Sequence, residues 1–378
     1  MDIGVPREIK NGETRVGATP RTTRVLTEAG HTLVVETGAG LGSGFSDGEY
    51  AAAGARVVPD ASEVYACAMV VKVKELQPPE YRRLRPGTLL ACYQQLAGDA
   101  ALLEAVLAAR ATCVAYEGVT GPGGGRPLLA PMSTMAGLLS AQIAAWALQH
   151  REGPLCGSGV LLPWMEGIPQ ARVLIVGDGS VGGAAAEAFL ALGCQVTVLG
   201  RSPAPAKRLE QRLAGCGRGT LRTALSTPAE LAVGTAEADV VVGAVSVPGR
   251  LAPRLITRAM LRAMRPGSVF IDIGIDMGGI AETSRHTKLS DPMFVEEGVL
   301  HYCVPNIPAL VPRAATQALA SATLPCLGLL AERGLDGALE AMPGLRDGLL
   351  VHDGRVVHPG LAADTGREFT AYRPEVRP

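Results

Sequence analysis

Aromatic residues and charge are both scarce in this chain. Phe, Trp and Tyr make up 4% of its 378 residues, charged residues make up 19%, and the formal net charge is −1. Because no run of Lys and Arg stands out, the sequence predicts no nucleic-acid or polyanionic partner. No pair of cysteines or histidines has the spacing of a zinc site, so we expect no bound metal.

Signals for secretion or membrane insertion are also missing. The first ten residues, MDIGVPREIK, include Arg7, Glu8 and Lys10 and form no apolar signal segment. No run of about 20 apolar residues lacks charge or glycine, so a membrane-spanning helix is not expected. The eight cysteines lie partly in apolar runs such as LLACY, where Cys acts as a small hydrophobic residue. We therefore expect a cytoplasmic protein with reduced thiols.

Hydrophobic residues (47%) and glycine (47 residues) are abundant, and the length suits two domains. In the first third, short β-branched runs alternate with stretches that carry apolar residues at helical spacing, which predicts βαβ units and a parallel sheet. The expected strands are 2–6, 32–37, 69–73, 88–93 and 112–117, and the expected helices are 19–30, 61–68 and 99–111.

A second alternation follows a long predicted helix, 133–149, and a Gly- and Pro-rich loop, 153–170. Its five expected strands are 172–177, 194–200, 238–245, 267–274 and 299–306. A last helix, 316–332, is rich enough in Ala and Leu to pack back against the first unit. After it, a hairpin is expected around Asp353-Gly354.

The strongest motif is a glycine-rich turn between a strand and a helix. Strand 172–177 runs directly into Gly177-Asp178-Gly179-Ser180-Val181-Gly182, and a helical stretch and a second strand follow. In this context Gly177, Gly179 and Gly182 allow a tight turn and close approach of a pyrophosphate to the backbone. The amides of Ser180, Val181 and Gly182 at the helix start then meet the phosphate charge. We predict a dinucleotide site here.

The end of the second strand departs from a typical NAD site, which has an acidic residue there to bind the ribose hydroxyls. This strand ends at Gly200, followed by Arg201 and Ser202. A missing carboxylate removes repulsion against a 2′-phosphate, and a guanidinium can bind one. The sequence therefore favours NADP(H) over NAD(H); the alternative is that Arg201 is a solvated loop residue.

Six ordered segments resemble the alanine dehydrogenase and pyridine nucleotide transhydrogenase family. They are GVPREIKNGETRVGATP, ETGAGLGSGFSDGEY, VKVKE, PLLAPMSTMAG, GSVFIDIGIDMGGIAETSR and HYCVPNIPALVPR. The resemblance, strongest to the alanine dehydrogenase branch, implies an α/β protein with two Rossmann-like domains and parallel sheets. A discontinuous substrate domain, 1–130 and 308–378, would surround a central dinucleotide-binding domain, 131–307. It also implies a homo-oligomer, either a hexamer or a dimer.

The resemblance also implies roles for several residues. Arg15 matches an arginine that grips the substrate carboxylate, and Lys74 matches a lysine that holds the carboxylate and the keto or imino group. Asp276 matches an acidic residue near nicotinamide and substrate. Asn306 matches an asparagine of the nicotinamide pocket, Ser133 lies in a segment near the cofactor, and Val247 lies in a loop across the nicotinamide ribose. Asp272, in the same run as Asp276, is expected to be structural.

One catalytic position breaks the pattern. The family has a histidine as general acid/base in a Tyr-Leu-His-Leu-Ala segment, whereas this chain reads Tyr93-Gln94-Gln95-Leu96-Ala97. An amide such as Gln95 donates a hydrogen bond but does not exchange a proton near neutral pH. If the reaction requires that proton, Asp276 or Tyr93 could supply it.

Three functions are therefore consistent with the sequence. The first is an NAD(P)H-dependent oxidoreductase that acts on the CH–NH₂ or C=N group of a small amino, 2-oxo or imino acid, in amino-acid metabolism. The second is a reductase of a preformed imine in specialised metabolism. The third is a non-catalytic nucleotide-binding subunit, similar to a transhydrogenase component. The expected partner in the first two cases is a small carboxylate-bearing substrate.

Overall fold

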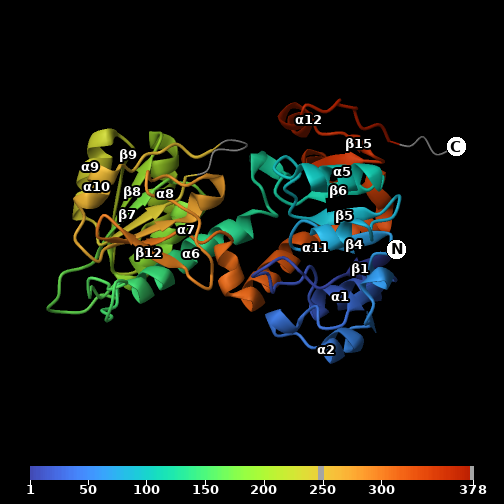
Figure 1. Ribbon diagram of the computed structural model, residues 1–378, viewed down its shortest axis with the longest axis horizontal. Helices are drawn as coiled ribbons and strands as arrows, with labels where there is room; N and C mark the ends of the chain where they lie inside the picture. Colours follow the sequence, from blue (N-terminus) through green and yellow to red (C-terminus); the bar gives the residue numbers. More distant parts are fainter. Residues whose placement is uncertain (246–250, 375–378) are drawn as a thin grey trace. The chain divides into compact units, whose positions relative to one another are not determined.

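The computed structural model describes residues 1–245 and 251–374, and the chain divides into two compact units. Unit 1 comprises Met1–Met132 and Ala309–Pro378, and unit 2 comprises Ser133–Pro308. Each unit is built on its own sheet, with helices on both faces (Figure 1). The predicted α/β class with two Rossmann-like domains is confirmed. The boundaries expected from the sequence, 130/131 and 307/308, lie two residues and one residue before those of the structure.

The sheet of unit 1 has eight strands in the order β15-β14-β6-β5-β4-β1-β2-β3. The six strands from β6 to β3 are parallel, and β14 and β15 extend that sheet with antiparallel pairing. The strands are β1 Asp2–Val5, β2 Thr32–Glu36, β3 Arg56–Val58, β4 Met69–Val71, β5 Leu89–Cys92, β6 Thr112–Ala115, β14 Leu349–His352 and β15 Arg355–Val356. Because helices cover both faces, β4, β5 and β6 are buried throughout, and all their residues except Thr112 are apolar.

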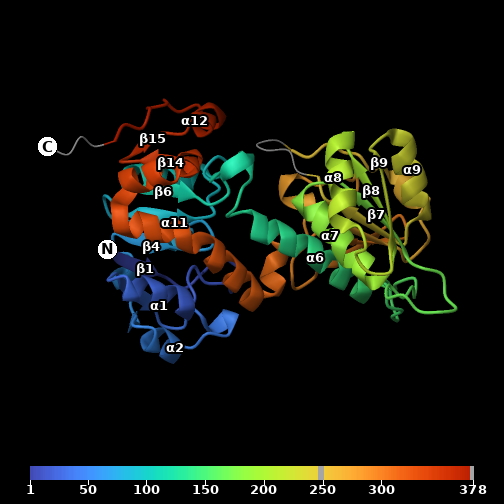
Figure 2. The ribbon, with the colours of Figure 1, turned by 180° about the vertical axis from the view of Figure 1, so that it is seen from behind.

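Helices cover both faces of this sheet. The helix α5, Ala100–Ala108, faces the viewer in Figure 1, and the long helix α11, Pro312–Ala341, faces the viewer in Figure 2, which shows the opposite side. Leu102, Leu103 and Val106 of α5 join one buried cluster with residues of β4, β5 and β6. The remaining helices of unit 1 are α1 Pro20–Glu28, α2 Asp47–Ala52, α3 Ala61–Val64, α4 Pro78–Tyr81 and α12 Pro359–Thr365.

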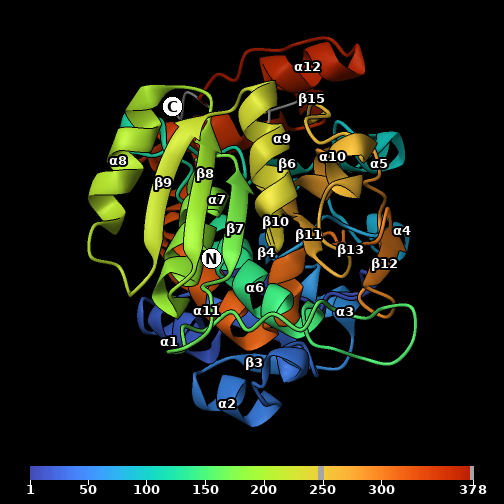
Figure 3. The same ribbon diagram turned by 90° about the vertical axis from the view of Figure 1, so that its left-hand side faces the viewer.

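Unit 2 has a seven-stranded sheet in the order β12-β13-β11-β10-β7-β8-β9 (Figure 3). All strands except β12 run parallel. The chain starts at β7 inside the sheet, adds β8 and β9 on one side, and then adds β10, β11 and β13 on the other side. The strands are β7 Arg172–Val176, β8 Gln195–Gly200, β9 Thr220–Leu225, β10 Val240–Gly243, β11 Val269–Asp272, β12 Met293–Glu296 and β13 Val299–Tyr302. This order creates a switch point between β7 and β10, where α/β sheets bind ligands.

The helices α7, Ser180–Leu192, and α9, Pro228–Glu237, cover opposite faces of this sheet (Figure 3). A Cβ on Gly182 of α7 would meet Ile175, whereas a Cβ on Gly234 of α9 would meet Leu174. Because neighbouring strand residues point to opposite faces, the two helices lie on different sides of β7. The other helices in this part of the chain are α6 Ala130–Ala147, α8 Pro203–Leu213 and α10 Arg258–Arg262.

Three strands were not predicted from the sequence: β3, β9 and β12. Each lies at or near the edge of its sheet, where one side of the strand meets solvent. In β9 every residue is exposed or half-buried, and polar residues interrupt the apolar run that is typical of a central strand. The predicted strands of both blocks are all present.

The long helices agree with prediction in place but not in length. The helix predicted at 133–149 is α6, which begins at Ala130 because Pro131 is tolerated in a first turn. The helix predicted at 316–332 is the first part of α11, which begins at Pro312; Gly334, with φ +68° and ψ −174°, is not helical, so a kink follows the predicted end and a second helical stretch continues to Ala341. The hairpin around Asp353-Gly354 is confirmed: β14 and β15 pair across these two residues, which both have positive φ, as the turn requires.

Within residues 1–245 and 251–374, one helix, α11, is long and apolar enough to cross a membrane by length and composition alone, although half of its most apolar window is buried inside the protein. Leu319, Leu327 and Leu330 are fully or almost fully buried. This burial is typical of a core helix. All eight cysteines are free thiols, and six of them are buried.

Candidate active site

The glycine turn of unit 2 has the geometry that a dinucleotide requires. Gly177 has φ +116°, and a Cβ there would lie 2.4 Å from the carbonyl oxygen of Ala244 at the end of β10. A Cβ on Gly182 would lie 1.8 Å from the carbonyl oxygen of Gly177, so α7 approaches the turn closely. By contrast, a Cβ on Gly179 would meet no atom within 4 Å. The turn is therefore closed on the protein side and open on the other.

The open side of the turn faces the first amides of α7. Gly179 is the N-cap residue, and as a glycine it has no side chain to accept hydrogen bonds from those amides. Ser180 is exposed and Val181 is half-buried, and the first turn of α7 carries no acidic residue. Backbone N–H groups at a helix start bind a pyrophosphate well, so the residues present fit the predicted cofactor.

At the neighbouring strand end, Gly200 is buried whereas Arg201 and Ser202 are exposed. A carboxylate lies beside them that sequence reasoning missed. The carboxylate of Asp178 comes within 2.2 Å of the point where a Cβ of Gly200 would be. Its Oδ2 atom is buried and has no hydrogen-bond partner in the described part of the chain. The signal was present in the motif, because Asp178 is the residue between the first two glycines.

The remaining predicted residues of unit 2 differ in their surroundings. Asp276 is exposed in the 3₁₀ turn Ile273–Met277 that follows β11. Asn306 follows β13 and is half-buried with φ +58°, a left-handed conformation that Asn tolerates better than most residues. Ser133 is half-buried on α6. Val247 lies outside the described residues.

Asp272, at the end of β11, has a structural role, as the sequence suggested. Its Oδ2 accepts hydrogen bonds from the backbone N–H of Ile280 at 2.8 Å and from the hydroxyl of Ser284 at 2.5 Å. The side chain is fully buried, and this burial raises the pKa of its carboxyl group. These bonds attach the loop after Asp276 to the sheet.

In unit 1 the predicted substrate residues lie at one edge of the sheet. The neighbouring strands β1, β4, β5 and β6 are parallel, so their carboxyl ends meet at the same edge. Arg15 lies in the connection after β1, Lys74 follows β4, and Tyr93 and Gln95 follow β5. Glu117 follows β6 and was not predicted as a site residue. The topology thus gathers cationic, amide and carboxyl groups within one unit.

The guanidinium of Arg15 is buried and held in a fixed orientation. Its Nε and one terminal nitrogen donate to the two carboxylate oxygens of Glu13, at 2.7 and 2.6 Å. The other terminal nitrogen donates to the sulfur of Met132 at 3.0 Å. Both side chains of the ion pair are 1% exposed. A paired guanidinium of this kind presents a planar set of donors that suits a carboxylate.

Lys74 is half-buried, and its backbone is fixed by Glu8, which also pairs with a second lysine. Lys72 is fully buried and pairs with Glu8 at 3.1 Å and with Glu80 at 2.9 Å. Glu8 in turn accepts the N–H of Val73 at 2.6 Å and the N–H of Lys74 at 3.3 Å. Burial alone would lower the pKa of Lys72, but the two carboxylates outweigh it and raise that pKa.

The segment after β5 places its two predicted residues differently. The Tyr93 hydroxyl donates to the carbonyl oxygen of Leu128 at 2.7 Å, and burial raises the pKa of Tyr93 while the Arg15 charge lowers it. The Nζ atom of Lys74 lies 6.0 Å from the centre of the Tyr93 ring. Gln95, by contrast, is exposed. Tyr93 would have to break its bond to Leu128 before it could protonate a substrate.

Glu117 is a proton-holding group in this cluster. Its carboxylate accepts the N–H of Gln94, next to Gln95, at 2.9 and 3.2 Å from its two oxygens. Burial raises the pKa of Glu117 to about 7, although the charge of Lys74 lowers it. A carboxyl group that titrates near neutral pH can act as a general acid and base. Its position directly after a buried strand was the only sequence signal.

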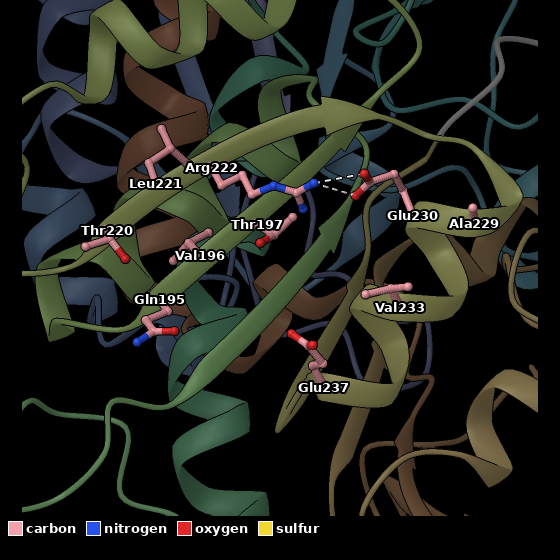
Figure 4. Close-up of a pocket in the computed structure, with 10 residues that line it drawn as sticks. All are labelled: Gln195, Val196, Thr197, Thr220, Leu221, Arg222, Ala229, Glu230, Val233 and Glu237. Carbon is pink, nitrogen blue, oxygen red and sulfur yellow. Dashed lines mark hydrogen bonds and ion pairs between the residues drawn. The ribbon is translucent and has the colours of Figure 1, made fainter.

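A pocket of unit 2 has none of these residues in its lining (Figure 4). It is lined by the first halves of β8 and β9 and by α9. Arg222 crosses it to form two hydrogen bonds with Glu230, at 2.9 and 2.7 Å. Cofactors of doubly wound sheets bind at the carboxyl ends of the strands, so this pocket is not the candidate site.

Comparison with known proteins agrees with this geometry. Residues 4–136 match the model for the alanine dehydrogenase/PNT N-terminal domain, and residues 140–359 match that for the C-terminal domain. An alanine dehydrogenase of Halomonas elongata is 45% identical over 370 residues, which cover 98% of each chain. An alanine dehydrogenase of Staphylococcus haemolyticus is 43% identical over 372 residues, again 98% of each chain.

Two solved structures also resemble this chain. An L-alanine dehydrogenase is 43% identical with a TM-score of 0.91, over 97% of this chain and 99% of the other. A transhydrogenase from Sinorhizobium meliloti is 26% identical with a TM-score of 0.79, over 95% of this chain and 99% of the other. The similarity therefore extends over both units.

Proposed function

The chain belongs to the alanine dehydrogenase/PNT family, and on that basis we propose that it is a nicotinamide dinucleotide-dependent oxidoreductase of a small amino acid and its 2-oxo or imino acid. One observation carries the proposal. Arg15, Lys74 and Glu117 lie at the carboxyl ends of neighbouring strands of unit 1, while unit 2 offers an open glycine turn at its own strand ends. The first group suits an amino or oxo acid, and the second suits a dinucleotide.

The cofactor would be held by the amides of Ser180, Val181 and Gly182, which receive the pyrophosphate, and by Asp276, Asn306, Ser133 and Val247 nearer the nicotinamide. When bound, nicotinamide supplies hydride transfer to or from the substrate carbon. The glycine turn excludes side chains from the approach to the phosphates. For the adenosine end, Arg201 and Ser202 support NADP(H), as the sequence predicts, whereas Asp178 supports NAD(H).

The substrate would be anchored through its carboxylate. Arg15 has its guanidinium fixed by Glu13, so little side-chain freedom is lost when a carboxylate binds. Lys74 has its backbone fixed by Glu8 and carries its charge on the same edge of the sheet. Its ammonium group would bind the carboxylate and polarise the keto or imino group.

A proton must accompany each hydride. Gln95 can hydrogen-bond an imine but does not deliver a proton. We assign proton transfer to Glu117, because its pKa of about 7 permits both protonation states near neutral pH. Asp276 and Tyr93 are the alternatives, and Tyr93 already donates its hydroxyl proton to Leu128.

A second candidate function is the reduction of a C=N bond that arrives already formed. It is favoured by Gln95, since hydride transfer to an iminium ion requires no histidine to form a carbinolamine. A third, a non-catalytic nucleotide-binding subunit, is supported by the similarity to a transhydrogenase. The charged groups of unit 1 argue against this third function, because nucleotide binding alone does not require them.

We further propose a cytoplasmic homo-oligomer, a hexamer or a dimer, with a small carboxylate-bearing substrate and no nucleic-acid or membrane partner. The net charge of −1 supports the expectation of no nucleic-acid partner, and the burial of α11 supports that of no membrane partner.

Steady-state assays test the function directly. The purified chain would be given pyruvate, glyoxylate or longer 2-oxo acids with ammonia, and separately a preformed cyclic imino acid, each with NADH and NADPH. Turnover that requires ammonia supports the amino-acid dehydrogenase, and turnover of the imino acid alone supports the imine reductase. If no substrate is turned over although a dinucleotide binds, the non-catalytic subunit is the correct function.

A further inference from the structure

The carboxylate beside the end of β8 comes from the glycine turn and not from the strand itself. NAD sites place this carboxylate at the end of the second strand, where it accepts hydrogen bonds from the ribose hydroxyls. That position is Gly200 in this chain, which has no side chain. The prediction of NADP(H) depended on the absence of a carboxylate at this point. The structure has a carboxylate there, from Asp178.

Asp178 occupies the space that a side chain at position 200 would require. The Oδ2 and Cγ atoms of Asp178 lie 2.2 and 2.7 Å from the ideal Cβ position of Gly200. Real Cβ atoms do not show such distances, so a side chain at position 200 would require the Asp178 carboxylate to move out of this space. The glycine at 200 and the aspartate at 178 are thus two parts of one arrangement.

The backbone holds Asp178 in this place. The N–H of Gly177 donates to the carbonyl oxygen of Leu199 at 2.8 Å, so pairing between β7 and β8 continues up to the residue before Asp178. On its other side Asp178 is followed by Gly179, the N-cap of α7. The carboxylate therefore lies between the phosphate-binding amides and the end of β8, as a ribose-binding group must.

The carboxylate also needs a hydrogen-bond donor. Its Oδ2 atom is buried and has no partner within residues 1–245 and 251–374, while the residue as a whole is half-buried. Buried polar atoms in folded proteins almost always have a partner, and an exception marks a place for a ligand or water. A ribose diol has two adjacent hydroxyl donors, which match one carboxylate.

We propose that Asp178 binds the 2′- and 3′-hydroxyls of the adenosine ribose and selects NAD(H) over NADP(H). A 2′-phosphate would remove one donor and bring its negative charge against the carboxylate. Arg201 is the opposing group, but it is exposed and would have to be ordered to bind a 2′-phosphate. This inference rests on the proposed dinucleotide-dependent function.

The test measures dissociation constants of NADH and NADPH by calorimetry on the full chain, without turnover. We expect the unmodified protein to bind NADH more tightly. Asp178→Gly should weaken NADH binding by about 10- to 100-fold, the range for charge-assisted hydrogen bonds, and should reduce or reverse the preference. Asp178→Gly combined with Gly200→Asp should restore NADH binding, because the carboxylate returns to the same space from the other strand.

The outcomes separate this inference from the proposed function. Binding of neither nucleotide to the unmodified protein would overturn both. NADH binding that Asp178→Gly leaves unchanged, or tighter NADPH binding that Arg201→Ala abolishes, would overturn only the role of Asp178. Glu187→Gln, which removes an exposed carboxylate from α7, is the matched control and should change neither constant.

Discussion

The two units share a strand order but differ in the connection after their first strand. In each sheet the first strand, β1 or β7, has the next two strands of the chain on one side and the following strands on the other side. In unit 1 residues 6–19 separate β1 from α1, and this loop carries Glu8, Glu13 and Arg15. In unit 2 residues 177–179 alone separate β7 from α7. The same fold thus presents charged side chains at the carboxyl ends of the strands in unit 1 and backbone amides at the carboxyl ends of the strands in unit 2.

The charges near the strand ends of unit 1 also differ from surface ion pairs, which both units carry. In unit 1 the charges of Arg15 and Lys72 are buried and paired, whereas in unit 2 the pair Arg222–Glu230 is largely exposed, at 57% and 34%. Paired charges of low exposure keep their strength but are costly to break, and exposed pairs contribute little. A long loop can therefore build a rigid cationic site only if carboxylates are buried with it.

The largest expected effect tests this contrast. Lys72→Met would leave Glu8 and Glu80 buried without their cation, and we expect a loss of about 3–5 kcal/mol of unfolding free energy. Arg222→Met breaks an exposed pair and should cost at most about 1 kcal/mol. Urea denaturation of both variants checks the difference. Equal losses would show that burial does not distinguish the two kinds of pair.

The second prediction concerns the amide edge. Gly179→Asp has room for its side chain, but the new carboxylate would repel a pyrophosphate, so NADH affinity should fall by at least about 100-fold. Gly48→Asp is the matched control, because Gly48 is exposed, lies in the first turn of α2 and has no atom nearer than 3.9 Å to its Cβ position. Calorimetric titration with NADH gives both values. Unchanged affinity in Gly179→Asp would refute the phosphate site.

The third prediction concerns the histidine position of unit 1. Gln95→His should raise the rate of alanine formation from pyruvate and ammonia by about 10- to 100-fold, because an exposed imidazole at this position adds a faster proton-transfer group to Glu117. Gln94→His is the comparison: Gln94 is buried, so a histidine there would not contact a substrate and should not raise the rate. Initial rates under saturating NADH measure the effect. The absence of any gain in Gln95→His would indicate a pocket rebuilt for another substrate.

The same comparison explains which strands and site residues could be predicted from the sequence. Strands such as β4 and β10 were predicted because burial on both faces makes them continuous apolar runs. The glycine turn was predicted because its spacing is local in the chain. Glu117 and Asp178 were missed as site residues, because their significance depends on a neighbouring strand, Gln94 in one case and Gly200 in the other. The spacing of residues along the chain does not predict which distant segments lie side by side.

The smallest expected effect comes from Glu117 of unit 1, which combines the two features compared above: its side chain can carry a charge, but its hydrogen-bond partner is a backbone amide. Its pKa is raised from 4.5 to about 7, so the folded protein binds this proton more tightly than the unfolded chain. The resulting stabilisation is complete below about pH 4.5 and is lost as the pH rises to about 7.

Glu117→Gln stays neutral and can still accept the Gln94 N–H. At about pH 8 the variant should therefore exceed the unmodified protein by about 1–2 kcal/mol in unfolding free energy, and near pH 5 this difference should largely disappear. Urea denaturation at both pH values, with the exposed Glu187→Gln as control, provides the measurement, and a difference independent of pH would show that Glu117 does not hold a proton in the folded state.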